Sequence, residues 1–370
     1  MAKKLVIAGG GHAHMTTLEN LHRFVERGHQ VTVIGPSDHH YYSGMGPGML
    51  GNTYAPEEVR FATRQVVEKQ GCIFIRDKIT GIDGEGQNVR LESGDTIPYD
   101  VLSCNLGSQV PRRIIAGELE DIYLVKPIER LLAAQRRIVE LGRQKSIRVG
   151  IVGGGPSAVE IAGNVWRLIQ DSKLRPAQIK ILTKSTIMPN HREGIRKRAV
   201  DSLKKRGIVI HENCETDRIS TGKISESNGK THDLDIIFVA IGITPNPVFA
   251  DSGLQVGMDG GMLVNRYLQS TAHDNIFGGG DCICFQDKPL DKVGVYAVRQ
   301  NPILLHNLLA RLEGKELQPF EPGGRYLLIF NLGDGTGILN KWSIQIGGRL
   351  AFMAKDYIDR RFMKRFQRIE

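Results

Sequence analysis

Two glycine-rich stretches, LVIAGGGHAHMTTLENL at 5–21 and VGIVGGGPSAVEIAGNV at 149–165, determine the fold expected of this chain. Each begins with a short apolar run typical of a strand and continues with helical spacing. A glycine turn between strand and helix lets the backbone approach a pyrophosphate, because free N–H groups at the helix N-terminus attract anions. Two such turns predict two dinucleotide sites, one passing electrons to the other.

The composition is typical of a globular protein. The chain has 370 residues, 41% apolar and 24% charged, which is enough for two or three domains. We find no run of 18 apolar residues, and the first strand begins at Leu5, so we expect neither a transmembrane helix nor a signal peptide. Five scattered cysteines do not form a disulfide framework, which favours a cytoplasmic location.

The net charge of +9 is concentrated in two basic clusters, at 192–206 and 360–368. Neither cluster has a recognisable nucleic-acid-binding motif, so we expect no nucleic-acid partner. Solvated helix faces account for both clusters. For the C-terminal cluster, an acidic membrane surface is the alternative.

Strands alternate with helices after each turn, which predicts an α/β fold with parallel sheets. We expect two Rossmann-like dinucleotide-binding domains, the second inserted in the first, plus a small C-terminal element. The sequence regains strand-and-turn character before Asn275–Asp281, which we interpret as a return to the first domain. The expected bounds are 1–110 and 246–322 for the first domain, 111–245 for the second, and 323–370 for the C-terminal element.

Three further segments give the chain a family resemblance over nearly its full length. YDVLSCNLGS (99–108) and IIFVAIGITPN (236–246) look like the two chain-crossing segments of the pyridine nucleotide-disulfide oxidoreductase superfamily. NIFGGGDC (275–282) looks like its second flavin motif. The resemblance implies that the discontinuous first domain binds FAD and that the inserted domain binds NAD(P)H.

The C-terminal segments of the chain resemble a narrower group within this superfamily. GGRYLLIFNLGDGTGILN (323–340) and GGRLAFMAKDYIDRRFMKRF (347–366) are similar to type II NADH:quinone dehydrogenases. The phrases GGGHAH, YYSGMGPGML, GVYAVRQNP and IDRRFM look closer still to dehydrogenase-like flavoproteins that are sometimes fused to selenophosphate synthetase. The resemblance implies an FAD-dependent NAD(P)H dehydrogenase that passes electrons to a quinone or similar acceptor.

The residues expected at FAD come from both halves of its domain. Gly9 and Gly11 should face the pyrophosphate, and Asp281 should accept hydrogen bonds from the ribityl hydroxyls. His14 replaces the third glycine, where it should loosen helix–strand contact or point at the cofactor. Gly35 stands where a ribose-binding acid is usual, so Ser37, Asp38 or the backbone should hold the ribose. The full set is Gly9, Gly11, His12, Ala13, His14, Ser37, Ser43, Ile79, Gly107, Gly280, Asp281 and Tyr296.

The nicotinamide nucleotide is expected at Gly153, Gly155, Ala158, Lys184 and Gly242. Its usual ribose acid is also missing, and Lys184 could pair with a 2′-phosphate, which leaves NADH and NADPH both open.

The resemblance places the catalytic group at Glu160, Tyr296 and Gln300. Glu160 is expected near the nicotinamide–flavin contact, with an exposed helix carboxylate as the alternative. Tyr296–Gln300 should begin a helix whose positive N-terminal end faces the flavin. Gln300 alone clearly matches the quinone motif of the type II enzymes.

The positions of the cysteine and histidine residues bear on the alternatives to an NAD(P)H dehydrogenase. The segment YYSGMGPGMLG (41–51) lacks the cysteine pair of disulfide reductases, which argues against that reaction. A sulfide- or other chalcogen-oxidising flavoenzyme using Cys104, Cys282 or Cys284 stays open, although small buried thiols are the simpler interpretation. A non-catalytic flavin redox sensor is the second alternative. We expect no metal, because histidines such as His12 and His14 beside phosphates more often donate hydrogen bonds.

Residues 350–370 have the pattern of a basic amphipathic helix. Such a helix suits a membrane surface, which is where a quinone would be met. Docking on its own domain or in a homodimer is the alternative. We therefore expect a cytoplasmic protein that is able to bind peripherally to the inner face of the cell membrane.

Overall fold

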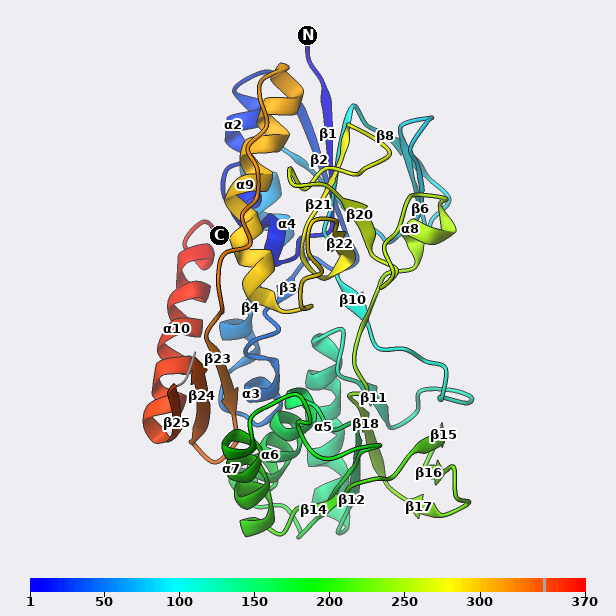
Figure 1. Ribbon diagram of the computed structural model, residues 1–370, viewed down its shortest axis with the longest axis vertical. Helices are drawn as coiled ribbons and strands as arrows, with labels where there is room; N and C mark the ends of the chain where they lie inside the picture. Colours follow the sequence, from blue (N-terminus) through cyan, green and yellow to red (C-terminus); the bar gives the residue numbers. More distant parts are fainter. Residues whose placement is uncertain (342–343) are drawn as a thin grey trace.

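The computed structural model describes residues 1–341 and 344–370, and it contains two five-stranded parallel sheets in separate lobes (Figure 1). The first sheet has the spatial order β21 (Ile276–Gly278), β9 (Val101–Cys104), β1 (Lys4–Ala8), β2 (Gln30–Gly35) and β5 (Ile73–Arg76). The second has the order β11 (Ile122–Leu124), β18 (Ile236–Val239), β12 (Arg148–Val152), β13 (Gln178–Leu182) and β14 (Val209–His211). The strand before each glycine turn is central in its sheet, which confirms the predicted fold class.

Helices cover both sheets. The first lobe has η1 (His12–His14), α1 (Met15–Glu19), α2 (His22–Val25), α4 (Thr63–Lys69) and α9 (Gly294–Glu313). The second has α5 (Glu129–Gln144), α6 (Pro156–Asp171) and α7 (Glu193–Lys205). Ile7, Phe24 and Phe277 lie in the core of the first lobe, and Ile161 and Phe238 in that of the second.

The chain passes between the lobes twice, at two short strands that pair with each other. β10 (Ser108–Gln109) and β19 (Thr244–Pro245) are antiparallel. The predicted domain bounds at 110/111 and 245/246 fall at or next to this pair of strands. Each lobe also carries a three-stranded antiparallel sheet: β6 (Ile79–Asp83), β7 (Asn88–Leu91) and β8 (Thr96–Pro98) in the first, β15 (Thr216–Ser220), β16 (Lys223–Glu226) and β17 (Thr231–Asp233) in the second.

Shorter elements complete the first lobe and the connection between the lobes. They are β3 (His40–Tyr41), α3 (Gly46–Leu50), η2 (Pro56–Val59), β4 (Arg60–Phe61), α8 (Val248–Asp251), β20 (Met262–Val264), η3 (Gly280–Cys282) and β22 (Ile283–Phe285).

The C-terminal element bridges the two lobes (Figure 1). It consists of β23 (Leu328–Asn331), β24 (Gly337–Lys341), β25 (Ile344–Gly348) and α10 (Arg349–Gln367), with residues 342–343 outside the described part. The turn after β23 lies so close to α6 that a Cβ on Gly163 would stand 2.1 Å from the carbonyl oxygen of Leu332. On the other side, α10 packs against β4 and η2.

Candidate active site

One large cleft, of about 2250 Å³, is lined by both glycine turns and by part of the C-terminal element. Residues from the turn after β1, from the end of β12 and from the turn after it face the cleft, as do residues from β23 and α10. The carboxyl ends of central parallel strands are where open α/β sheets bind ligands. A single cleft of this kind brings the two expected dinucleotide sites together.

The first glycine turn leaves no room for side chains. Gly9 has φ of 89°, and a Cβ on it would lie 2.3 Å from the carbonyl oxygen of Asn105. A Cβ on Gly11 would lie 2.7 Å from the Asn105 amide nitrogen. Sequence reasoning missed Asn105, although it stands within the quoted chain-crossing segment.

Three buried nitrogen atoms around this turn lack a hydrogen-bond partner within the described part of the chain: His12 Nε2, His40 Nε2 and Asn105 Nδ2. All three residues line the cleft. Burial lowers the pKa of His12 to about 4 and that of His40 to about 3, so both rings are neutral at pH 7. Unpaired buried groups of this kind are costly unless a ligand satisfies them, so the residues present fit a cofactor rich in polar oxygens such as FAD.

His14 and Ala13 lie behind the cleft wall. The His14 ring makes hydrogen bonds with the Gly9 carbonyl oxygen at 2.6 Å and with Ser103 Oγ at 2.7 Å. From the sequence we expected the His14 side chain to loosen helix–strand contact or to point at the cofactor. Instead, it ties the turn to β9. Ala13 is buried against Gly279.

Asp281 is held by two cleft residues. Its Oδ2 accepts hydrogen bonds from Lys126 Nζ at 2.7 Å and from Ser108 Oγ at 2.8 Å. Burial alone would raise the pKa of Asp281, but the Lys126 ammonium and the Ser108 hydroxyl hold it below its usual value. Asp281 is therefore an ionised acceptor beside the first turn, and Lys126 is a cleft cation that sequence reasoning missed.

The two residues expected at the start of the flavin-facing helix have different surroundings. α9 begins at Gly294, and Tyr296 lines the cleft with its ring 5.6 Å from that of Tyr326. Gln300 is buried, and its Oε1 accepts a hydrogen bond from the Gly280 N–H at 2.7 Å. Gln300 therefore holds the second flavin motif in place from behind.

The second glycine turn shows the same close backbone approach as the first at its leading glycine. Gly153 has φ of 129°, and its Cβ would lie 2.2 Å from the carbonyl oxygen of Ala240. Gly155 and Gly242 face open space, since a Cβ on either would meet no described atom within 4 Å. Ala158 is buried in α6, where it packs in the second core.

Glu160 lies in the cleft wall where the lobes and the C-terminal element meet. Its Oε1 accepts a hydrogen bond from the backbone N–H of Asn331 at 2.8 Å. Burial raises the pKa of Glu160 to about 7, although the nearby Lys355 ammonium and the Asn331 N–H lower it in part. Lys355 itself donates to Gly44 O at 2.7 Å and to Asp359 Oδ2 at 2.6 Å.

The sequence model of the pyridine nucleotide-disulphide oxidoreductases matches residues 3–306. This chain belongs to that family. Membership implies an oxidoreductase with FAD and NAD(P)H as cofactors, which agrees with the resemblance found from the motifs.

Relatives and solved structures align with nearly the whole length of this chain. It is 24% identical to the demethylphylloquinone reductase NdbB of Synechocystis sp. (95% of this chain, 90% of the relative) and to the type II NADH:quinone oxidoreductase of Staphylococcus saprophyticus (95% and 93%). Its fold is similar to that of NDH2 from Plasmodium falciparum in complex with NADH (TM-score 0.81, 14% identity, covering 98% of this chain and 96% of that one). It is also similar to the sulfide:quinone oxidoreductase of Aquifex aeolicus (TM-score 0.78, 19% identity, covering 100% and 92%).

In the second lobe, shortly after β13, Lys184 forms an ion pair. Its Nζ lies 2.5 Å from Glu215 Oε1, and both residues line the cleft of the oxidoreductase. Glu215 was missed from the sequence because it follows β14, far along the chain from the second strand where the ribose acid is sought. In the first lobe, Asp38 is paired with Arg64 and Arg76, at 3.2 and 3.6 Å. The other predicted residues, Ser37, Ser43, Ile79 and Gly107, line the cleft.

Cys104, Cys282 and Cys284, the cysteines considered for a thiolate mechanism, are not among the residues that line the cleft. Cys104 and Cys282 are fully buried, and the Cys282 thiol donates to the carbonyl oxygens of Cys104 (3.5 Å) and Gly279 (3.3 Å). Burial raises the pKa of Cys282 to about 11 and that of Cys104 well above its usual value. For Cys284, burial and the nearby Asp259 raise the pKa as well. Thiolate chemistry at these positions is therefore disfavoured at neutral pH.

Within residues 1–341 and 344–370, we find no helix with the length and apolar character needed to cross a bilayer.

Proposed function

We propose that this oxidoreductase is an FAD-dependent NAD(P)H dehydrogenase that reduces a quinone or a similar acceptor. FAD, when bound, accepts a hydride from the nicotinamide and releases two electrons to the acceptor. The observation that carries the proposal is the single cleft shared by the two glycine turns, with Glu160 at their junction and Asp281 beside the first. The names of the two relatives support the quinone as acceptor.

Four features of the cleft have a role in this proposal: Asp281, Lys126, the N-terminus of α9 and Glu160. Asp281 binds the ribityl hydroxyls, and Lys126 keeps its carboxylate ionised. The N-terminus of α9 at Gly294 offers a positive dipole end, which favours negative charge on a reduced cofactor. Glu160, when ionised, stabilises the positive charge that develops on a nicotinamide as hydride leaves it.

The Lys184–Glu215 pair bears on the choice of nucleotide. A free lysine would favour the 2′-phosphate of NADPH. Glu215 neutralises this charge, and its carboxylate is itself an acceptor suited to the ribose hydroxyls of NADH. We therefore propose that the protein prefers NADH.

The exposed face of α10 supports a membrane-bound acceptor. Leu350, Met353 and Tyr357 are 72%, 62% and 64% exposed and follow each other at helical spacing. The same face continues in the exposed basic residues Arg361, Lys364 and Arg368. An apolar stripe followed by cations suits the interface of an anionic membrane. A homodimer contact is the alternative occupant.

Anaerobic stopped-flow mixing of the FAD-loaded protein with NADH or NADPH tests the reaction. We expect rapid loss of flavin absorbance with NADH and slower loss with NADPH, then reoxidation by a soluble quinone. A flavin that neither nucleotide reduces would overturn the proposal and leave the redox-sensor alternative. A flavin that is reduced but not reoxidised by quinone would overturn only the acceptor.

The similarity to a sulfide:quinone oxidoreductase keeps one rival function testable. In that rival, Cys104 or Cys282 would act as a thiolate, although both are buried behind the wall. We expect flavin reduction by NADH to be unchanged in the variants Cys104→Ser and Cys282→Ser. Sulfide-dependent flavin reduction that disappears in either variant would establish the rival.

A further inference from the structure

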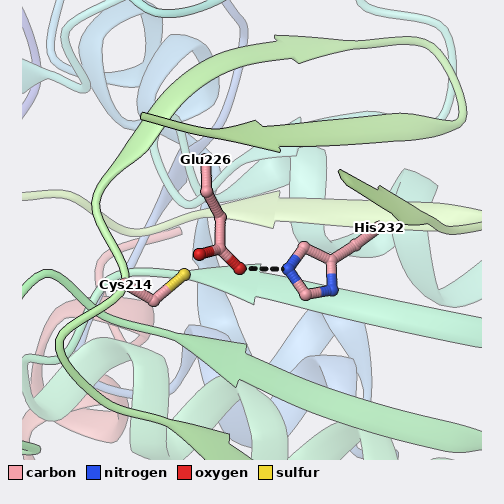
Figure 2. Close-up of side chains that lie close together, drawn as sticks. All are labelled: Cys214, Glu226 and His232. Atoms are coloured by element: carbon pink, nitrogen blue, oxygen red, sulfur yellow. Dashed lines mark hydrogen bonds and ion pairs between the residues drawn. The ribbon is translucent and has the colours of Figure 1, made fainter. Parts of the chain in front are cut away.

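A buried cluster of three metal-ligating side chains lies in the second lobe, beside the Lys184–Glu215 pair, and one of its members, Cys214, also lines the cleft. Cys214, Glu226 and His232 are 5%, 7% and 6% exposed, and their ligand atoms all lie within 4.8 Å of one another. Figure 2 shows the Cys214 sulfur beside one carboxylate oxygen of Glu226 and the His232 ring beside the other. His232 Nε2 lies 2.5 Å from Glu226 Oε1.

Two of the three residues lie in the small antiparallel sheet, and the third lies in the connection that leads to it from the parallel sheet. Cys214 follows β14, and its N–H donates to Thr183 O at 2.9 Å, which anchors it to the parallel sheet. Glu226 ends β16, and His232 lies in β17, both in the small antiparallel sheet. A tight turn holds these two strands in register, and the Glu226 N–H donates to the Lys230 carbonyl oxygen at 2.8 Å. The cluster is therefore assembled only where the small sheet meets the Rossmann-like sheet.

We propose that Cys214, Glu226 and His232 bind one Zn²⁺ ion. A thiolate, a carboxylate and a neutral imidazole together carry two negative charges, which balance a divalent cation in a buried place. This mixture of sulfur, nitrogen and oxygen ligands selects zinc over magnesium or calcium. Ligand atoms around tetrahedral zinc stand about 3.3 Å apart, so the His232 and Glu226 atoms need to separate by less than about 1 Å.

The fourth position is available to a water molecule or to a further histidine. The ring of His211, at the end of β14, lies 5.6 Å from that of His232. The Asn228 amide donates to Glu226 Oε2 at 2.9 Å, as the outer partners of metal ligands commonly do. From the sequence we expected no metal. The proposed site was not recognised there, because its members are separated in the sequence by strands and turns.

Zinc uptake by the full-length FAD-loaded protein tests the site. After chelator treatment and dialysis against Zn²⁺, elemental analysis should find one equivalent. The variants Cys214→Ser and His232→Gln should bind zinc more weakly by at least about tenfold. Cys72→Ser, which changes a buried thiol of the other lobe, should retain it. Absence of stoichiometric zinc, or undiminished uptake by both variants, would overturn the proposal.

A second measurement does not depend on the folding of any variant. X-ray absorption at the zinc edge of the unaltered protein should show one sulfur ligand at about 2.3 Å with nitrogen or oxygen ligands at about 2.0 Å. A shell of nitrogen and oxygen alone would mean that zinc sits on surface residues, and the proposal would fail.

Discussion

The Glu160 carboxylate in α6 accepts a hydrogen bond from the backbone N–H of Asn331, the last residue of β23, at 2.8 Å. The inserted lobe and the C-terminal element thus meet at the residue that we propose to act on the nicotinamide. The same element reaches the first lobe, where the Phe362 ring stacks 6.2 Å from that of His12. The C-terminal element therefore helps to shape both halves of the cleft.

Glu160→Gln should change the pH dependence of flavin reduction. The pKa of Glu160 is raised to about 7, so its ionised fraction grows as pH rises through this value. Because the ionised form stabilises positive charge on the nicotinamide, the rate with NADH should rise to a plateau above about pH 7. In the variant the profile should be flat near pH 7 and the rate lower. Stopped-flow traces at several pH values measure this.

Glu193→Gln, at an exposed carboxylate that begins α7, is the matched control and should keep the profile of the unaltered protein. An inflection near pH 7 that persists in Glu160→Gln would assign the titration to another group.

Asp281→Asn should weaken FAD binding. The change removes an ionised acceptor and leaves Lys126 without its carboxylate partner. A charge-assisted hydrogen bond contributes about 1.5–3 kcal/mol, so the FAD dissociation constant should rise roughly tenfold to a hundredfold. Fluorescence titration of the apoprotein with FAD measures it. Asp287→Asn, at an exposed site, serves as control, and equal affinity in both variants would contradict the role of Asp281.

Glu215→Gln should shift the nucleotide preference toward NADPH. Removing the carboxylate frees Lys184 to pair with the 2′-phosphate. We expect the ratio of kcat/KM for NADPH to that for NADH to rise by roughly tenfold, equivalent to one charge-assisted hydrogen bond. The double variant Lys184→Gln/Glu215→Gln should lose this gain. A preference that stays unchanged in the single variant would show that the nucleotide binds away from this pair.

Substitution of Leu350, Met353 and Tyr357 by serine should reduce flotation with anionic vesicles. Each exposed side chain contributes roughly 1 kcal/mol on entering the interface, so the triple variant should bind roughly a hundredfold more weakly. The control replaces three exposed apolar residues elsewhere, Ile73, Val209 and Met258. Undiminished flotation would point instead to a contact between two copies of the chain, which sedimentation would detect.

Deletion of the whole of α10 would not be a suitable test of membrane binding. Met363 and Phe366 are 2% exposed, and Lys355 and Asp359 are buried with their partners. Truncation would uncover the core and disturb the packing around His12. Substitutions on the outer face leave these contacts in place.

Much of the fold was predictable because its determinants are local. The glycine turns at Gly9 and Gly153 follow apolar strands, and the backbone approach they permit is a property of a few neighbouring residues. The chain crossings at 99–108 and 236–246 were instead predicted from the family resemblance of those segments. The predicted domain bounds and site assignments remain predictions, although most of the assigned residues line one cleft.

The interactions that sequence reasoning missed join residues that are far apart in the chain. Lys126 meets Asp281 across 155 positions of the chain, and Glu215 meets Lys184 across 31 positions. His14 stands in a motif position yet turns to Ser103, because β9 lies beside β1 in the sheet.

The sequence by itself determined the two strand–turn–helix units, because glycine conformation and apolar periodicity act over short distances. Only the tertiary structure decided which charges pair and which atoms remain unpaired in the cleft. It also brought Glu160 to the C-terminal element and Cys214 to Glu226 and His232. These relationships depend on how sheets and helices pack, which joins residues that the chain keeps far apart.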